Sequence, residues 1–217
     1  MSNQTAPSAR TRVRRVPNRG RYDLEFIYAV LDEALVCHVG FVSSGQPFVM
    51  PTLCVRIASE LFIHGASTSR LIEHAASGEP LCITITLVDG VVLARSAFHH
   101  SLNYRSVVVL GQARLVSDPL EKEQVSTALV ERVAPGRSWL VRAPNQLELK
   151  ATSVLGVPLT ESSAKVRTGG PIDDEEDLAW PVWAGVIPLR LEPQAPEVAE
   201  PQCPGATVPR LGRGLNR

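Results

Sequence analysis

This 217-residue chain has few lysines, few cysteines and no formal net charge. Only three of the 22 basic side chains are lysines, and 22 acidic side chains bring the formal net charge to zero. Nucleic-acid-binding domains usually carry a basic excess, so we expect no nucleic-acid partner. The four cysteines form no CxxC pair and are too few for a disulfide framework at this length. The composition therefore indicates a reducing compartment.

Long apolar segments and several familiar motifs are also missing. No run approaches the roughly 20 apolar residues that span a bilayer. The Arg14-Arg15 pair is not followed by the apolar stretch of a secretion signal. The chain contains no P-loop, no GxGxxG and no GxSxG sequence. We therefore expect a cytoplasmic protein without a membrane partner.

The two ends of the chain differ from its middle. Residues 1–21 contain six arginines and almost no apolar side chain, and residues 192–217 contain five prolines without hydrophobic periodicity. Such segments bury too little apolar surface to offset the entropy of ordering. We predict a flexible basic segment at 1–21, one domain at 22–191 and a disordered proline-rich tail at 192–217. The alternative for the basic segment is that it lies across a partner surface.

The middle of the chain has the pattern of a β-protein with a few helices. Short β-branched or aromatic runs predict strands, and helical spacing after a capping residue predicts helices. The predicted strands are 36–42, 47–55, 60–64, 81–88, 91–98, 106–116, 154–159, 165–167 and 182–191, and the predicted helices are 24–35, 68–76, 120–133 and 145–152. Residues 43–46 and Asp89-Gly90 are candidate hairpin turns. This order predicts a mainly β fold, a β-barrel with helical additions, with a sandwich as the alternative.

The segment LFIHGASTSRL, residues 61–71, is the first candidate site. A predicted strand ends at His64, Gly65 allows a close turn, and Ser67, Ser69 and Arg70 stand where a helix starts. Hydroxyls, a guanidinium and the free N–H groups of a helix start can together bind a phosphate. The alternative is an ordinary helix start, since serine and threonine are common caps.

The segment FHHSLNYRSVVVLG, residues 98–111, is the second candidate site. Residues 103–106 stand at a predicted strand entrance, where loops often carry function, and the alternative is a solvated loop. His99 and His100 point to opposite faces of an extended chain, and the other histidines lack metal-ligand spacing, so no metal site is predicted. His38 lies in an apolar run and is predicted to be buried. The acidic run 173–177 is interpreted as a solvated loop.

Four pieces of the sequence resemble one family. They are PFVMPTL (47–53), LFIHGASTSR (61–70), NYRSVVVLGQARLV (103–116) and PVWAGVIPL (181–189). They resemble the pyridoxamine 5'-phosphate oxidase-like flavoproteins, the FMN-binding split β-barrels. The branch of the nitroimidazole-resistance (Nim) and related flavin-nucleotide-binding proteins is the nearest. The resemblance spans about residues 12–190 and implies a homodimer of six-stranded barrels with FMN at the interface.

The resemblance also assigns residues to the cofactor. Residues 49–53 match the strand along the flavin ring, and Ser69 and Arg70 match the phosphate site. Trp183 matches a tryptophan that packs near the flavin from the other subunit. The full cofactor-binding set is Val49, Met50, Pro51, Thr52, Leu53, His64, Gly65, Ser67, Ser69, Arg70, Arg105, Ser106 and Trp183. His64 is also the candidate catalytic residue, which would orient a substrate or supply a proton.

Two departures from the family narrow the expected function. Leu71 stands where the oxidases carry a lysine, and residues 186–189 lack their late arginine and histidine. Oxidation of pyridoxamine phosphate is therefore not expected. The resemblance instead implies an FMN-dependent oxidoreductase for a small molecule, with nitroreductase-like chemistry as the nearest analogue. The alternatives are a non-catalytic flavin or haem carrier, and an F420-dependent reductase whose basic segment clamps the anionic cofactor tail.

Overall fold

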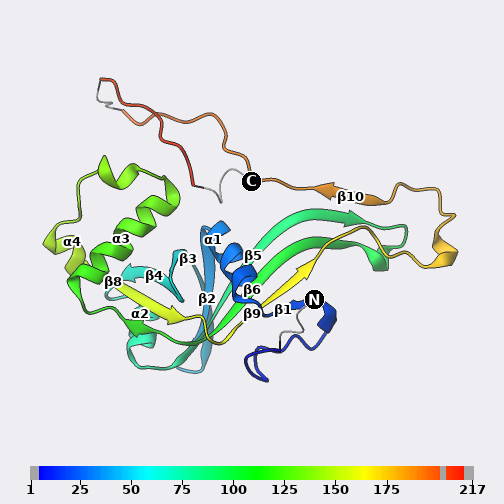
Figure 1. Cartoon of the computed structure of the whole chain (residues 1–217), viewed down its shortest axis with the longest axis horizontal. Coiled ribbons are helices and arrows are strands. Elements are labelled where there is room, and N and C mark those ends of the chain that lie inside the picture. The colour runs from blue at the N-terminus through cyan, green and yellow to red at the C-terminus, as the bar shows by residue number, and fades with distance from the viewer. Residues whose placement is uncertain (1–4, 201–203, 213–217) are drawn as a thin grey trace.

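Antiparallel strands dominate the computed structural model of the chain, which describes residues 5–200 and 204–212 (Figure 1). The remaining parts of the two predicted tails, residues 1–4, 201–203 and 213–217, lie outside the described residues. The strands are β1 (Gly20–Arg21), β2 (Val36–Ser43), β3 (Gln46–Ile57), β4 (Glu60–Ala66), β5 (Pro80–Leu93), β6 (Ser101–Gln112), β7 (Arg114–Leu115), β8 (Thr152–Pro158), β9 (Ser162–Arg167) and β10 (Gly185–Pro188). The helices are α1 (Leu24–Glu33), α2 (Arg70–Ala76), α3 (Pro119–Val133) and α4 (Gln146–Ala151). The fold is mainly β with a few helices, as the sequence predicts.

The pairing of the strands closes the sheet on itself. Nine strands follow the order β1-β9-β6-β5-β2-β3-β4-β8-β7, and β10 pairs with β5. Only Ala113 separates β6 from β7, and this bent stretch pairs with β5 and β9 along β6 and with β8 along β7. The sheet therefore curls around its core, which fully buried side chains such as Ile27, Ile63 and Ile83 fill.

The four predicted helices are present, and local capping explains where they begin. Asp23 accepts a hydrogen bond from the Phe26 N–H at the start of α1, and Asp118 accepts one from the Leu120 N–H at the start of α3. Asn145 forms a capping box at α4. Such caps satisfy backbone donors that the helix leaves unpaired, so they can be recognised from the sequence alone. No helix in the described part of the chain is long and apolar enough to cross a membrane.

One predicted hairpin is correct and the other is wrong. Ser44 and Gly45 both have positive φ, 51° and 76°, as a type I′ turn between β2 and β3 requires. Asp89-Gly90, in contrast, lies inside β5, where the pairing with β6 shifts register between Val88 and Gly90. It is a β-bulge. A Cβ on Gly90 would lie 3.0 Å from the Ile187 carbonyl oxygen, so the close approach of β10 favours glycine at this position.

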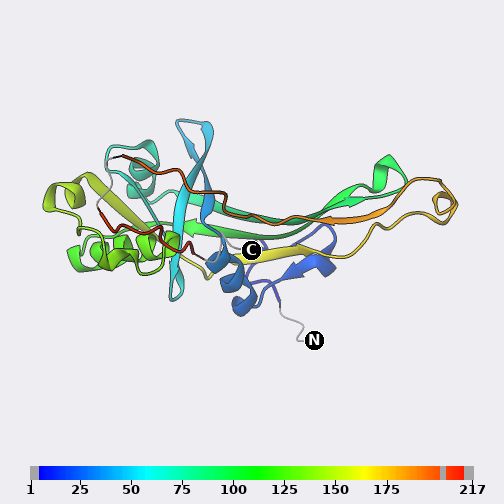
Figure 2. The ribbon, with the colours of Figure 1, turned by 90° about the horizontal axis from the view of Figure 1, so that it is seen from above.

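An arm projects from the barrel. We define the arm as residues 88–103 and 168–188, which comprise the distal parts of β5 and β6, the segment after β9, and β10. It extends away from the end of the molecule that carries α2, α3 and α4 (Figures 1 and 2). Residues 103–106 belong to the continuous strand β6. Their predicted place at a strand entrance is therefore wrong, because β6 begins earlier, at Ser101.

The described parts of the two terminal segments contact the rest of the chain at a few points. Gly20 and Arg21 pair with β9, and the Arg10 guanidinium lies 3.4 Å from the Glu161 carboxylate. Residues 189–200 and 204–212 form no helix or strand. The Gly212 N–H nevertheless donates to the Val133 carbonyl at the end of α3, at 2.8 Å.

Candidate functional site

The connection from β4 to α2 brings the predicted phosphate-binding residues together. Ser69 Oγ accepts a hydrogen bond from the Ile72 N–H at 3.4 Å and so caps α2. The Arg70 guanidinium lies 4.2 Å from the centre of the Phe48 ring on β3. In the described part of the chain no carboxylate pairs with Arg70, and its side chain is exposed. Its positive charge is therefore available to an anion.

The predicted flavin-ring strand presents an unpaired edge beside this connection. Residues 46–53 of β3 pair with β2, whereas β4 pairs only with residues 54–57. Within the described residues, the other edge of 46–53 has no strand partner. Thr52 Oγ1 lies 3.5 Å from the His64 carbonyl oxygen, and the His64 side chain is exposed next to this edge. Unpaired backbone groups at an edge can bind a planar ligand through hydrogen bonds.

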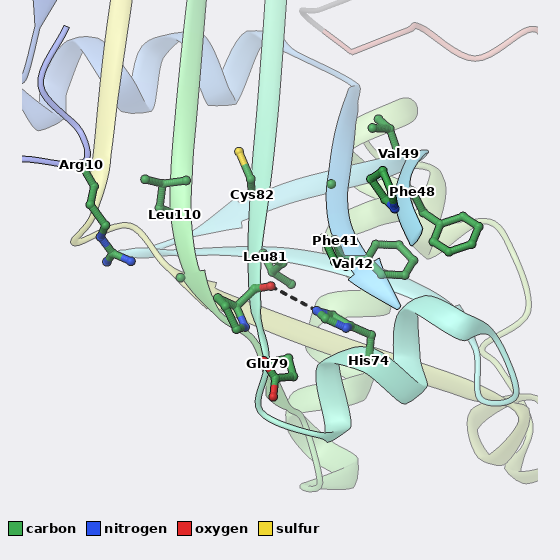
Figure 3. A pocket seen from close by; sticks show the side chains of 14 residues that line it. Arg10, Phe41, Val42, Phe48, Val49, His74, Glu79, Leu81, Cys82 and Leu110 are labelled. Atoms are coloured by element: carbon green, nitrogen blue, oxygen red, sulfur yellow. Dashed lines mark hydrogen bonds between the residues drawn. The ribbon is translucent and has the colours of Figure 1, made fainter. Parts of the chain in front are cut away.

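An apolar cavity adjoins the same strand. Phe48 and Val49 contribute to a cavity of about 460 Å³, together with residues of β2, β5, β6 and α2 (Figure 3). Gly40 pairs with Val49 on one side and with Cys82 on the other. Gly40 is one of the residues that line the cavity. The lining residues are spread between positions 10 and 111, so no local motif reveals the cavity from the sequence.

Arg105 has ion-pair partners away from this connection. Its guanidinium donates to the Asp89 carboxylate at 2.8 and 2.9 Å, and it also donates to both oxygens of Glu33. The hydrogen bonds that Arg105 donates to these two carboxylates raise its pKa. Ser106 Oγ donates to the Lys165 carbonyl at 3.2 Å. Arg105 thus belongs to a network that joins α1, β5 and β6.

Trp183 lies on the arm, away from Arg70 within one chain. Its indole packs so closely on Gly185 that a Cβ there would lie 2.8 Å from the ring. β10 pairs with β5 at Val92, whereas Pro80, at the other end of β5, follows α2. Twelve residues of strand place these points about 40 Å apart. Trp183 and Arg70 can therefore meet only if they come from different chains.

The five histidines differ in which ring nitrogens are free. His74 Nε2 lies 3.1 Å from the Pro80 carbonyl oxygen (Figure 3), and His99 Nε2 lies 3.1 Å from Asp174. His100 binds the Ser96 carbonyl through Nδ1 at 2.9 Å, which leaves Nε2 free. His38 and His64 are exposed, and their rings have no hydrogen bond to any described residue.

The prediction that His38 is buried is therefore wrong. Its neighbours Cys37 and Val39 are both fully buried. Successive side chains of a strand alternate between the two faces of the sheet, so His38 points outward.

Comparison with known proteins identifies the family. Residues 23–166 match the pyridoxamine 5'-phosphate oxidase family, and the chain belongs to it. This confirms the resemblance found in the four sequence pieces. No curated protein is significantly similar to the chain.

Two solved structures are similar over nearly the whole chain. The flavocytochrome Anf3 from Azotobacter vinelandii is 41% identical, covers 95% of this chain and 96% of its own, and has a TM-score of 0.89. The FAD and haem binding protein from Mycobacterium smegmatis is 34% identical, with coverages of 88% and 94% and a TM-score of 0.82. A candidate 5-nitroimidazole resistance protein from Bacteroides thetaiotaomicron, 21% identical with coverages of 68% and 86% and a TM-score of 0.57, shares the fold.

Proposed function

We propose that this protein is a flavin- and haem-binding oxidoreductase, active as a homodimer of split barrels. The six barrel strands would be β2, β3, β4, β5, the bent β6–β7 and β8, which the pairing joins into a ring. The observation that carries the proposal is the exposed Arg70 charge, free of any carboxylate among the described residues, beside an unpaired edge of β3. The bound flavin would supply the electron-transfer chemistry.

The residues at the β4–α2 connection suit a flavin phosphate. Arg70 can donate two parallel hydrogen bonds to phosphate oxygens. Ser69 Oγ accepts from Ile72, so its own O–H stays free to donate, and Ser67 adds a second hydroxyl. The backbone of residues 49–53 would bind the polar edge of the ring. FMN meets these requirements with its single phosphate. FAD, after which the M. smegmatis relative is named, presents a phosphate at the same position of the ribityl chain.

Haem is the second proposed cofactor, because both similar structures are named for it. A histidine that binds iron through Nε2, the ring nitrogen farther from the backbone, needs that nitrogen free of a hydrogen bond. Among the described residues, His38, His64 and His100 meet this condition. In His100 the hydrogen bond from Nδ1–H to the Ser96 carbonyl also fixes the ring, as the second bond of an iron-binding histidine commonly does.

Single alanine variants of these three histidines test the haem assignment. Loss or displacement of the haem absorption band in at least one of them is expected. His99→Ala is the matched control, because its Nε2 is already bound to Asp174, and its band should not change. Haem spectra that are identical in all four variants would contradict histidine ligation by this set.

His64 is the candidate for substrate chemistry, since it is exposed next to the β3 edge. The test reduces the flavin with dithionite under argon and then mixes it with oxygen or a nitroaromatic acceptor. Rapid reoxidation of the wild type, with slower reoxidation of His64→Ala but not of His38→Ala, would support an enzyme. Equal rates in all three proteins would leave His64 without a catalytic role. Reoxidation by no acceptor would indicate a carrier.

A further inference from the structure

The arm carries aromatic side chains that are largely exposed to solvent. Phe98 is 89% exposed, and Trp180 and Trp183 are each 62% exposed. Together they present roughly 400–500 Å² of aromatic surface. Exposed apolar surface of this extent on a soluble protein is often a binding surface. The aromatic surface of the arm therefore indicates a partner.

The same end of the arm carries a dense negative charge. Asp173 pairs with Arg95, and Asp174 lies next to His99. The next three residues, Glu175, Glu176 and Asp177, form no ion pair with any residue that the structure describes. Three adjacent carboxylates without cations repel one another, so they favour a basic partner.

The opposite charge lies on the N-terminal part of the chain. Arg12, Arg14 and Arg15 are exposed, and none of them pairs with a carboxylate between residues 5 and 200 or 204 and 212. The segment is nevertheless held on the barrel. Thr11 is buried, and the Val13 N–H donates to the Tyr22 hydroxyl at 2.9 Å. The structure thus presents three guanidinium groups on a fixed backbone.

Additional positive charge lies close to this segment. Arg167 is buried and donates to Asn103 and to two backbone carbonyls, without a carboxylate partner among the described residues. Burial and the nearby Arg19 lower the pKa of Arg167. A negative partner at this surface would relieve the repulsion between these arginines.

The two charged surfaces are too far apart to pair within one chain. Gly20 pairs with Lys165, Lys165 pairs with Ser106, and Ser106 pairs with Thr86, so these residues lie side by side across the sheet. The acidic run begins where Asp173 meets Arg95. Nine residues of strand separate Thr86 from Arg95, which corresponds to about 30 Å. This exceeds the Debye length of about 8 Å at physiological salt, so salt screens the attraction between the two surfaces of one chain.

We propose that the partner is a second copy of this chain: the acidic run 175–177 of each arm docks on Arg12, Arg14 and Arg15 of the other copy. One chain carries both surfaces, and a two-fold dimer pairs each surface with its complement twice. The aromatic side chains of the arm would then pack on the other barrel. This proposal rests on the homodimer of the proposed function and names the contact that holds it.

Charge reversal on each side tests the contact, with the dimer dissociation constant measured by sedimentation velocity at 0.15 M salt. The acidic variant is Glu175→Lys, Glu176→Lys and Asp177→Lys; the basic variant is Arg12→Glu, Arg14→Glu and Arg15→Glu. Each should raise the dissociation constant at least tenfold. The combined variant should return it to within threefold of wild type, because both charges are exchanged. Asp177 is half-buried and the other substituted positions are exposed, and circular dichroism checks that each variant folds.

A control with the same change in net charge as the acidic variant separates the contact from general electrostatics. Glu123→Lys, Glu192→Lys and Glu197→Lys substitute exposed residues outside the arm and should leave the dissociation constant within twofold. An unchanged dissociation constant in either test variant, or no recovery in the combined variant, would overturn the proposal. Weaker heparin binding by the basic variant with an unchanged dimer would also overturn it, and would point to a polyanionic partner.

A wild type that stays monomeric at every concentration would overturn both the arm contact and the proposed dimer. The flavin and haem content of the same sample, read from its absorbance, would still decide the cofactor part of the proposed function separately. A flavin-bearing dimer whose dissociation constant is unchanged by both charge reversals would overturn the arm contact alone.

Discussion

Replacement of Arg70 by alanine should weaken flavin binding by removing the contact with the phosphate and leaving the ring contacts unchanged. The guanidinium has no carboxylate partner among the described residues and rests on the Phe48 ring at 4.2 Å. A hydrogen-bonding partner of a charged group contributes about 1.5–3 kcal/mol. The dissociation constant for FMN should therefore rise by roughly 10- to 150-fold, as measured by quenching of flavin fluorescence.

Riboflavin provides the control, because it has the same ring and no phosphate. Its affinity should be nearly the same for wild type and for Arg70→Ala, so the preference for FMN over riboflavin should collapse in the variant. Arg70→Lys should retain part of the preference, since the charge remains but the two parallel hydrogen bonds are lost. Equal weakening of both ligands would show that Arg70 acts by packing on Phe48. No weakening of either would refute the phosphate site.

Three further predictions concern stability and reactivity. Arg105→Ala should lower the free energy of unfolding by about 1–2 kcal/mol, because two partly buried carboxylates lose their cation, and urea denaturation measures this. The Arg95 N–H and side chain hold the pKa of Asp173 below its usual value of 3.8. The ionised carboxylate therefore stabilises the arm above about pH 4, and this stabilisation is lost as the pH falls further. Tryptophan fluorescence between pH 6 and 2 should show this acid transition, and Asp173→Asn, but not Asp174→Asn, should already have the altered signal at neutral pH. The neighbouring Cys54 thiol and burial raise the pKa of Cys37, so iodoacetamide should leave Cys37 and Cys54 unmodified until the protein unfolds; their rapid labelling in the native protein would contradict the buried placement.

Local signals made part of the fold predictable. A cap such as Asp23 or Asp118 acts within three residues of its own position, so the sequence is enough to place the helix start. Asp89-Gly90 has the same local appearance as a hairpin turn. Its role as a bulge depends on β10, almost a hundred residues later in the chain, and on the ion pair from Asp89 to Arg105. Such long-range contacts leave no local trace.

The candidate site also combines parts that a local motif indicates with parts that depend on long-range contacts. Residues 64–70 are contiguous, so a single sequence motif is enough to indicate the candidate phosphate site. The cavity beside Phe48 assembles from residues far apart in the sequence. The apolar run around His38 predicted burial, but only the strand pairing shows which face of β2 is inside.

The cofactor content of the purified protein is the most direct test of the proposed flavin and haem binding. An absorbance spectrum, followed by mass spectrometry of the small molecules released on denaturation, identifies both groups and distinguishes FMN from FAD. We expect about one flavin per chain together with haem. A colourless protein that also fails to bind added FMN, FAD and haem would contradict it.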